Sequence, residues 1–196
     1  MTRPAARRLT RDDWAAAAAA ALATGGLAAV AVEPIAARLG ATKGSFYWHF
    51  ANRDDLVRAA LGHWEHRLTI DVLDRIETLE VDPATRLRLL IQEVTRSVQE
   101  DRIALALLAD ADHPIVGPVL ARVAERRVSG VAHIFEELGF SPDQARRRAL
   151  LAHSAYLGHA YLTSAAPPVL PPDHEARVAY LDEVLAVLTV ELPRVA

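Results

Sequence analysis

The chain has 196 residues, of which 52% are hydrophobic and 24% charged, and its formal net charge is −3. These values are typical of a folded protein with a sizeable core and exclude an intrinsically disordered chain. Because the sequence contains no cysteine, disulfide frameworks, thiolate catalysis and cysteine-ligated zinc are excluded, and we expect a cytoplasmic protein. The alanine-rich run at 15–23 directly follows charged residues and is too short to span a bilayer, so we interpret it as a helix and expect no membrane segment.

Positive charge is concentrated at the amino-terminal end. Residues 1–53 contain seven arginine or lysine residues and three acidic ones, a net charge of +4, which leaves −7 for the rest of the chain. A basic amino-terminal module on an acidic body is typical of a protein that meets nucleic-acid phosphates at one end. Chance asymmetry is the alternative, so charge alone does not decide the function.

Apolar residues recur at helical spacings of three and four along the whole chain, and no segment shows the alternation typical of a strand. After a basic arm at 1–9, this spacing predicts four helices, at about 11–23, 32–39, 43–49 and 53–80. Five more are expected at about 84–101, 103–109, 118–138, 142–163 and 174–192. The proline-rich segment at 165–172 is expected to be an extended connection. The sequence therefore predicts an all-α protein with nine helices.

Capping residues mark the ends of several of these helices. Thr10, Thr42 and Asn52 can each accept a hydrogen bond from the first turn of the helix that follows. Gly40 suits the left-handed backbone that commonly ends a helix.

The segment 32–50 reads VEPIAARLGATKGSFYWHF, which we interpret as two short amphipathic helices joined by a tight turn that contains glycine. This succession is typical of a helix-turn-helix, whose second helix enters the major groove of DNA. Phe46 and Phe50 lie four residues apart and are expected to fill the core side of the second helix.

The opposite side of that helix carries Lys43, Gly44, Tyr47 and Trp48. Lysine can donate to guanine acceptors, and an aromatic side chain can contact a thymine methyl group or reach a phosphate. We therefore predict that this side faces outward and reads DNA. The alternative is that Tyr47 and Trp48 are covered by the fourth helix as ordinary core residues.

Residues 26–56 follow the pattern GxxxxAVxxIAxxLGxxKGSFYxHFxNRxxL, which resembles the amino-terminal region of the TetR family of transcriptional regulators. The resemblance implies a three-helix DNA-binding domain at 10–55 and an effector-binding and dimerisation domain at 56–196. It also implies a homodimer that binds a near-palindromic operator, acts as a repressor, and is released by a small-molecule effector. No cofactor is implied.

Carried onto matching positions, the resemblance also implies which residues contact DNA. The family often has threonine or serine where this chain has Ala31, so we expect one phosphate contact and one helix cap to be missing, at a cost of about 1 kcal/mol. Base edges are expected to be contacted by Lys43, Gly44 and Tyr47. The DNA backbone is expected to be contacted by Thr42, Ser45, Trp48, His49 and Arg53.

Polar and aromatic side chains that share helix faces with apolar ones are the candidate effector contacts. They point to an apolar or aromatic effector. Each of them has the alternative of being an ordinary core residue. The candidates are Trp64, Gln92, Thr95, Gln99, His133, Phe135, His153 and Tyr156.

Small residues on the helix at 142–163 and an apolar stripe on the last helix predict a four-helix dimer interface, because small residues let paired helices approach closely. A contact within one chain is the alternative. The residues expected in the interface are Ala149, Ala152, Tyr156, Ala160, Leu181, Val184, Leu185 and Leu188.

Two other classes of function fit parts of the sequence. A metal-binding protein or an enzyme could use His63 with His66, or Asp110 with Asp112 and His113, but no further ligand, nucleophile or phosphate loop accompanies them. We therefore expect no enzyme and no metal site. A constitutive DNA-binding protein without a ligand would share every reader residue, but the body at 56–196 is larger than dimerisation alone requires.

Overall fold

The structure, a computed structural model, describes residues 8–97 and 102–190. Its amino-terminal helices are α1 (Arg11–Gly25), α2 (Val32–Arg38) and α3 (Lys43–Tyr47). A longer helical run follows, made of α4 (Arg53–Glu65), a π-helical segment (His66–Ile70) and α5 (Asp71–Glu77). The remaining helices are α6 (Pro83–Arg96), α7 (Arg102–Ala106), α8 (Val116–Glu137), α9 (Pro142–Ala165) and α10 (His174–Thr189).

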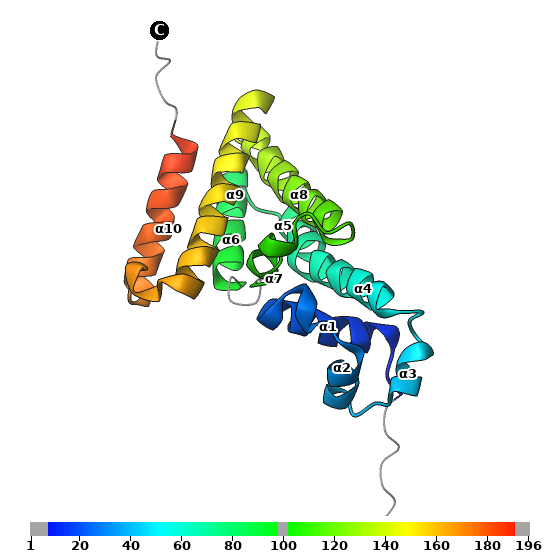
Figure 1. Ribbon diagram of the computed structural model, residues 1–196. Helices are drawn as coiled ribbons and strands as arrows, with labels where there is room; N and C mark the ends of the chain where they lie inside the picture. The colour runs from blue at the N-terminus through cyan, green and yellow to red at the C-terminus, as the bar shows by residue number, and fades with distance from the viewer. Residues whose placement is uncertain (1–7, 98–101, 191–196) are drawn as a thin grey trace, which may run out of the picture.

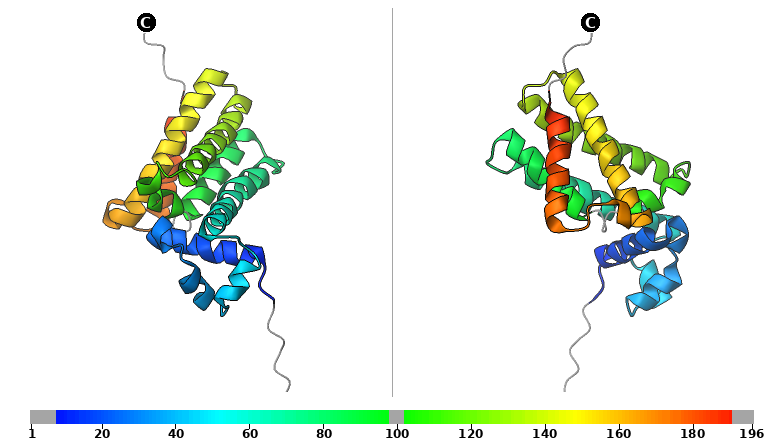
Figure 2. Two further views of the ribbon diagram at one scale, coloured as in Figure 1. Left: turned by 45° about the vertical axis from the view of Figure 1, so that its right-hand side comes forward. Right: turned by 90° about the vertical axis from the view of Figure 1, so that its left-hand side faces the viewer.

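The prediction of an all-α chain with nine helices is confirmed for the described residues, if the run from α4 to α5 is counted as one helix. Figure 1 shows α1 to α3 at one end of a body of longer helices. Both views of Figure 2 keep α1 to α3 at that end and the turn between α8 and α9 at the opposite end. In the part of the chain that the structure describes, no helix is both long and apolar enough to cross a membrane.

The predicted caps form as the sequence indicates. Thr10 makes a capping box with Asp13 at the start of α1. The Thr42 hydroxyl oxygen accepts a hydrogen bond from the Ser45 backbone N–H at 3.2 Å, and Asn52 caps α4 in the same way. Gly40 ends the turn after α2 with φ of 63°, in the left-handed region.

Some helix ends differ from those predicted. The fourth predicted helix ends at Glu77 rather than at 80, and its middle turn is π-helical. α8 begins two residues earlier than predicted, because Pro118 falls in the first turn, where the missing N–H costs little. The segment expected to be extended contains a short 3-10 turn at Pro167–Val169, and α10 ends at Thr189.

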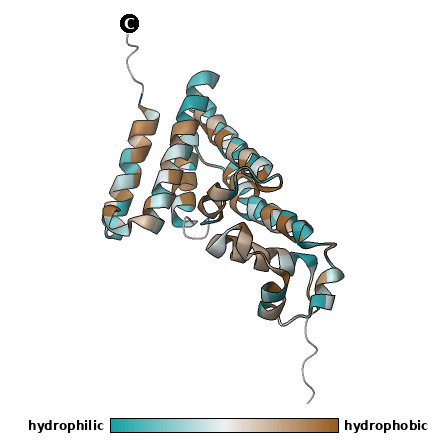
Figure 3. Ribbon diagram, viewed as in Figure 1, coloured by the Kyte–Doolittle hydropathy of each residue, from teal (hydrophilic) through white to brown (hydrophobic). Residues whose placement is uncertain are grey.

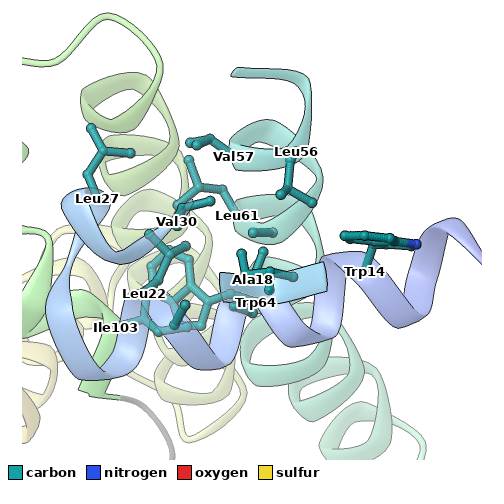
Figure 4. Packing of buried hydrophobic residues seen from close by; sticks show 14 of the residues in the cluster. Trp14, Ala18, Leu22, Leu27, Val30, Leu56, Val57, Leu61, Trp64 and Ile103 are labelled. Atoms are coloured by element: carbon teal, nitrogen blue, oxygen red, sulfur yellow. The ribbon is translucent and has the colours of Figure 1, made fainter. Parts of the chain in front are cut away.

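One hydrophobic core joins the amino-terminal helices to the body (Figure 4). Trp14 and Leu22 of α1 are buried together with Leu61 of α4. Ile103 at the start of α7 and Leu107 just after it are buried in the same cluster. The helix-turn-helix is therefore built on a core that residues of the body complete.

A second core lies between α5, α6, α8, α9 and α10. It includes Leu87 and Leu90 of α6, Phe135 of α8, and Leu185 and Leu188 of α10. Figure 3 shows hydrophobic and hydrophilic residues interspersed along α9 and α10.

An ion pair between a buried carboxylate and a half-exposed arginine connects α4 to α8. Glu65 is only 6% exposed, and Arg122 donates to its two carboxylate oxygens at 2.9 and 2.6 Å. These hydrogen bonds keep the pKa of Glu65 below its usual value despite the opposing effect of burial. Arg126 lies 3.4 Å away and adds a second cation. Because a buried carboxylate is costly without a partner, this pair fixes how α4 and α8 pack.

Candidate nucleic-acid interface

The position of α3 is set by two phenylalanines on its inner side. Phe46 and Phe50 are buried and stack with ring centroids 5.4 Å apart. Phe46 also meets the ring of Trp14 in α1 edge-on, at 5.6 Å. This part of the prediction is confirmed, and the packing holds α3 rigidly against α1.

The outer side of α3 is exposed, as predicted. Tyr47 is 59% and Trp48 83% exposed, and Lys43 and Gly44 are exposed beside them. The alternative, that the two aromatic side chains form core with the fourth helix, is therefore wrong. A cation, a bare backbone position and two aromatic side chains remain available on one outward surface, which we call the reading face (Lys43, Gly44, Tyr47, Trp48).

Lys43 has a partner within the protein that the sequence analysis missed. Its ammonium group lies 2.7 Å from the carboxylate of Glu33, in the first turn of α2. The hydrogen bond between them raises the pKa of Lys43 and lowers that of Glu33. Both side chains are exposed to solvent, so the pair is weak and Lys43 can exchange Glu33 for an acceptor on DNA.

The remaining residues around α3 are less exposed. Thr42 is exposed at the cap of the helix, and its hydroxyl can still donate while its oxygen accepts from the backbone. Ser45 and His49 are half-buried. Their roles as backbone contacts stay predictions.

Arg53 lies differently from the expected phosphate contact. Its Nε donates to the Val30 carbonyl at 2.7 Å and one terminal nitrogen donates to the Leu27 carbonyl at 2.5 Å. The side chain is half-buried and ties the turn at 27–30 to the start of α4. Because Leu27 and Val30 are far from Arg53 in the sequence, helical spacing gave no signal for this contact.

A substitution separates these two roles of Arg53. We expect Arg53→Gln to lower the free energy of unfolding by about 1–2 kcal/mol, because two carbonyls lose a charged donor. Urea unfolding measures this change, and Arg58→Gln, at an exposed position of α4, is the matched control. Unchanged stability together with a decrease of about one in the salt slope of DNA binding would instead identify a phosphate contact.

The missing cap at the start of α2 has a smaller energetic cost than the sequence predicts. Ala31 precedes the helix without any side-chain cap, as predicted. However, Pro34 is the third residue of α2 and has no N–H, so the donor that a cap most often satisfies at this position does not exist. The missing cap should therefore cost less than the expected 1 kcal/mol or so.

Two substitutions compare the caps of α2 and α3. Thr42→Ala should lower the free energy of unfolding by about 1 kcal/mol, since the Ser45 N–H loses its acceptor. Ala31→Ser should raise it by less than half that amount, because only the Glu33 N–H can use the new hydroxyl. Urea unfolding measures both changes, and a gain at Ala31 equal to the loss at Thr42 would contradict the role given to Pro34.

A cavity of about 100 Å³ lies in the body between the π-helical segment, α5, α6, α8, α9 and α10. Among the predicted effector contacts, Thr95, His153 and Tyr156 line it. Sequence reasoning missed several polar side chains in the wall of this cavity. Their helical spacing did not distinguish them from groups that face solvent. They are Thr69, Ser97, Arg127, His159 and Tyr180.

The other predicted effector contacts lie elsewhere. Trp64 and Phe135 are buried in the first and second cores. Gln92 and His133 are exposed to solvent. Gln99 lies outside the described residues. The alternative of an ordinary core residue therefore holds for Trp64 and Phe135, whereas Gln92 and His133 lie at the surface.

The residues predicted for the dimer interface turn mainly toward the interior of their own chain. Ala149, Leu185 and Leu188 are buried in the second core, and Ala160 is also buried. The others are half-buried, and five of the predicted residues line the cavity, namely Ala152, Tyr156, Leu181, Val184 and Leu188. Leu185 and Leu188 of the apolar stripe on α10 thus pack into the core of their own chain, and the predicted dimer interface stays a prediction.

Other apolar side chains of these two helices remain on the surface. In α9 they are Leu150, Leu151 and Tyr161, and in α10 Val187, each more than half exposed. Exposed hydrophobic side chains gathered on neighbouring helices are typical of a protein interface.

The metal-binding alternative gains no support from the geometry. His63 lies 3.1 Å from Asp12, and His66 lies 3.3 Å from Asp71. Asp110 accepts a hydrogen bond from the Leu27 N–H. No group of three or more possible metal ligands occurs within residues 8–97 and 102–190.

Comparison with known proteins agrees with this description of the amino-terminal helices. Residues 15–60 match the family of bacterial regulatory proteins described as the tetR family. This segment covers most of α1, all of α2 and α3, and the first half of α4. No curated protein sequence gives a significant match to the chain.

Solved structures resemble the whole fold. A transcriptional regulator from Rhodococcus sp. Rha1 has a TM-score of 0.72 at 22% identity, with 92% of this chain and 94% of that chain covered. A TetR transcriptional regulator from Legionella pneumophila has a TM-score of 0.72 at 15% identity, covering 92% and 95%. Salmonella enterica GusR has a TM-score of 0.71 at 19% identity, covering 95% and 97%. These likenesses extend the shared fold over the body.

Proposed function

We propose that this chain, whose helix-turn-helix domain and fold are of the TetR type, is a dimeric repressor that leaves its operator when a small molecule occupies the cavity. The observation that carries the proposal is the reading face, exposed on a helix that Phe46 and Phe50 hold in place. Two large aromatic side chains exposed next to each other are typical of an interaction site. A major groove provides one.

Within the reading face, Lys43 and Tyr47 supply the base contacts. Lysine donates to the O6 and N7 acceptors of guanine, and a ring can meet a thymine methyl group. Gly44 has no side chain and allows the DNA backbone or base edges to approach. Lys43 is the one lysine among 22 cationic side chains. Its removal therefore tests the only lysine contact that the chain can make with a base.

The partner in the dimer is a second copy of the chain, met through the exposed apolar residues of α9 and α10. A two-fold axis there turns the same surface of each copy toward the other. The two reading faces would then meet half-sites separated by roughly 34–36 Å or somewhat more, which gives a near-palindromic operator.

The coupling between cavity and DNA follows the chain from α6 to α7. Thr95 and Ser97 line the cavity at the end of α6. Soon afterwards, Ile103 and Leu107 enter the core of α1, and the Asp110 carboxylate accepts from the Leu27 N–H at 3.3 Å. A ligand that favours one position of the end of α6 can thereby shift α1 and the reading face between two states.

The proposal is tested by selecting bound duplexes from a randomised library at a stated salt concentration. The wild-type protein should enrich a near-palindrome, and Lys43→Ala should relax the preference at one position in each half-site. Arg147→Ala removes an exposed cation from α9 and should leave the selected sequence unchanged.

If neither the wild-type protein nor the control variant enriches any sequence, the proposed DNA reading is wrong. Enrichment that Lys43→Ala leaves unaltered would remove Lys43 from the base contacts. Tight binding to the selected operator that no small molecule weakens would favour a constitutive DNA-binding protein.

A further inference from the structure

The wall of the cavity differs in chemistry from one side to the other. α6 and α10 contribute aliphatic side chains, including Leu87, Leu90 and Val184. α9 contributes a polar row, His153, Tyr156 and His159, spaced three residues apart so that the side chains follow one another along the helix. The cavity is therefore apolar on one side and polar on the other.

Charge on the polar side has one sign. Arg127 of α8 lines the cavity, together with the imidazoles of His153 and His159, and no aspartate or glutamate occurs among the described lining residues. A guanidinium group stays protonated under all ordinary conditions. Within the described lining residues, the wall thus offers a cation and hydrogen-bonding nitrogens, and no carboxylate that could receive a cationic ligand.

Arg127 is held in a defined orientation. Its Nε donates to the Thr69 hydroxyl oxygen at 2.9 Å, and a terminal nitrogen donates to the Leu68 carbonyl at 3.1 Å. Its guanidinium carbon lies 5.6 Å from the centre of the Tyr156 ring and 5.7 Å from that of Trp64. A planar donor group fixed in this way is suited to recognise a carboxylate by geometry as well as by charge.

His159 supplies a second polar anchor. Its ring stacks on Tyr180 of α10, with centroids 5.9 Å apart. Its Nδ1 atom is buried and makes no hydrogen bond within the described part of the chain. Burial, and to a lesser degree the charge of Arg177, lowers the pKa of His159. A buried ring nitrogen without a partner is unfavourable, and a polar ligand group in the cavity would satisfy it.

We propose that the cavity binds an amphiphilic organic monoanion, a carboxylate carried on an alkyl or arylalkyl body. The carboxylate lies against the polar side formed by Arg127 and the α9 row, and the apolar body lies between α6 and α10. This inference rests on the proposed function, because it names the class of effector. The cavity, at about 100 Å³, is smaller than the roughly 150 Å³ cavity that holds benzene, so the apolar body is a short, slender chain.

The test uses three probes of one shape, octanoate, octanamide and octylammonium, with the full-length protein near neutral pH. Calorimetry measures their dissociation constants. Octanoate should bind at least about tenfold more tightly than the other two, because a charge-assisted hydrogen bond is stronger than a neutral one and octylammonium meets no carboxylate.

Two variants assign the preference to the polar side. Arg127→Gln should reduce the preference for octanoate over octanamide to less than about threefold, because the fixed cation is gone. Arg126→Gln, at the neighbouring residue of α8 outside the cavity lining, should keep the preference. If Arg127→Gln fails to fold, as judged by circular dichroism, His159→Phe keeps the stack on Tyr180 and should weaken octanoate binding several-fold.

Any of the following results would overturn the inference. Equal binding of the three probes, tighter binding of octylammonium, or no binding of octanoate at millimolar concentration would contradict an anionic effector. These results leave the proposed function intact, because selection of an operator requires no ligand. A failed selection together with preferential octanoate binding would instead overturn the DNA-binding proposal and keep the anion site.

Discussion

The structure depends on the packing of α7 against α1. Ile103 and Leu107 are buried in the same core as Trp14 and Leu22, so the helices that carry the reading face are not independent of the body. The Asp110 carboxylate strengthens this contact by accepting from the Leu27 N–H. Without α7, the part of the α1 core around Leu22 and Leu27 would lose the apolar cover of Ile103 and Leu107 and the hydrophobic stabilisation that it provides.

This packing also brings the cavity close to the core of α1, which is the basis of the proposed coupling between effector and DNA. The cavity reaches the end of α6, and only a short segment separates that end from α7. On the other side, the ion pair between the buried Glu65 carboxylate and Arg122 holds α4 against α8. The amino-terminal helices are thus joined to the body at two places, one fixed by an ion pair and one close to the cavity.

Sequence reasoning succeeded where structure is decided locally. The caps at Thr10, Thr42 and Asn52, the positive φ of Gly40, and the inner and outer sides of α3 each depend on residues only a few positions apart. It failed where the outcome depends on how a helix is rotated against distant neighbours.

Three particular places show that limit. Arg53 donates to the carbonyls of a distant turn, a contact that helical spacing did not indicate. Leu185 and Leu188 of α10 are buried in the core of their own chain. His159 of α9 lines a cavity that exists only after five helices have packed, beside His153 and Tyr156, which the sequence did predict.

The most direct test of the shared core is urea unfolding of Trp48→Phe, in which Trp14 and Trp64 are the remaining tryptophans. Their fluorescence and the far-ultraviolet circular dichroism should change in one coincident transition, whereas earlier loss of the fluorescence signal would show that the amino-terminal helices unfold apart from the body and contradict the account.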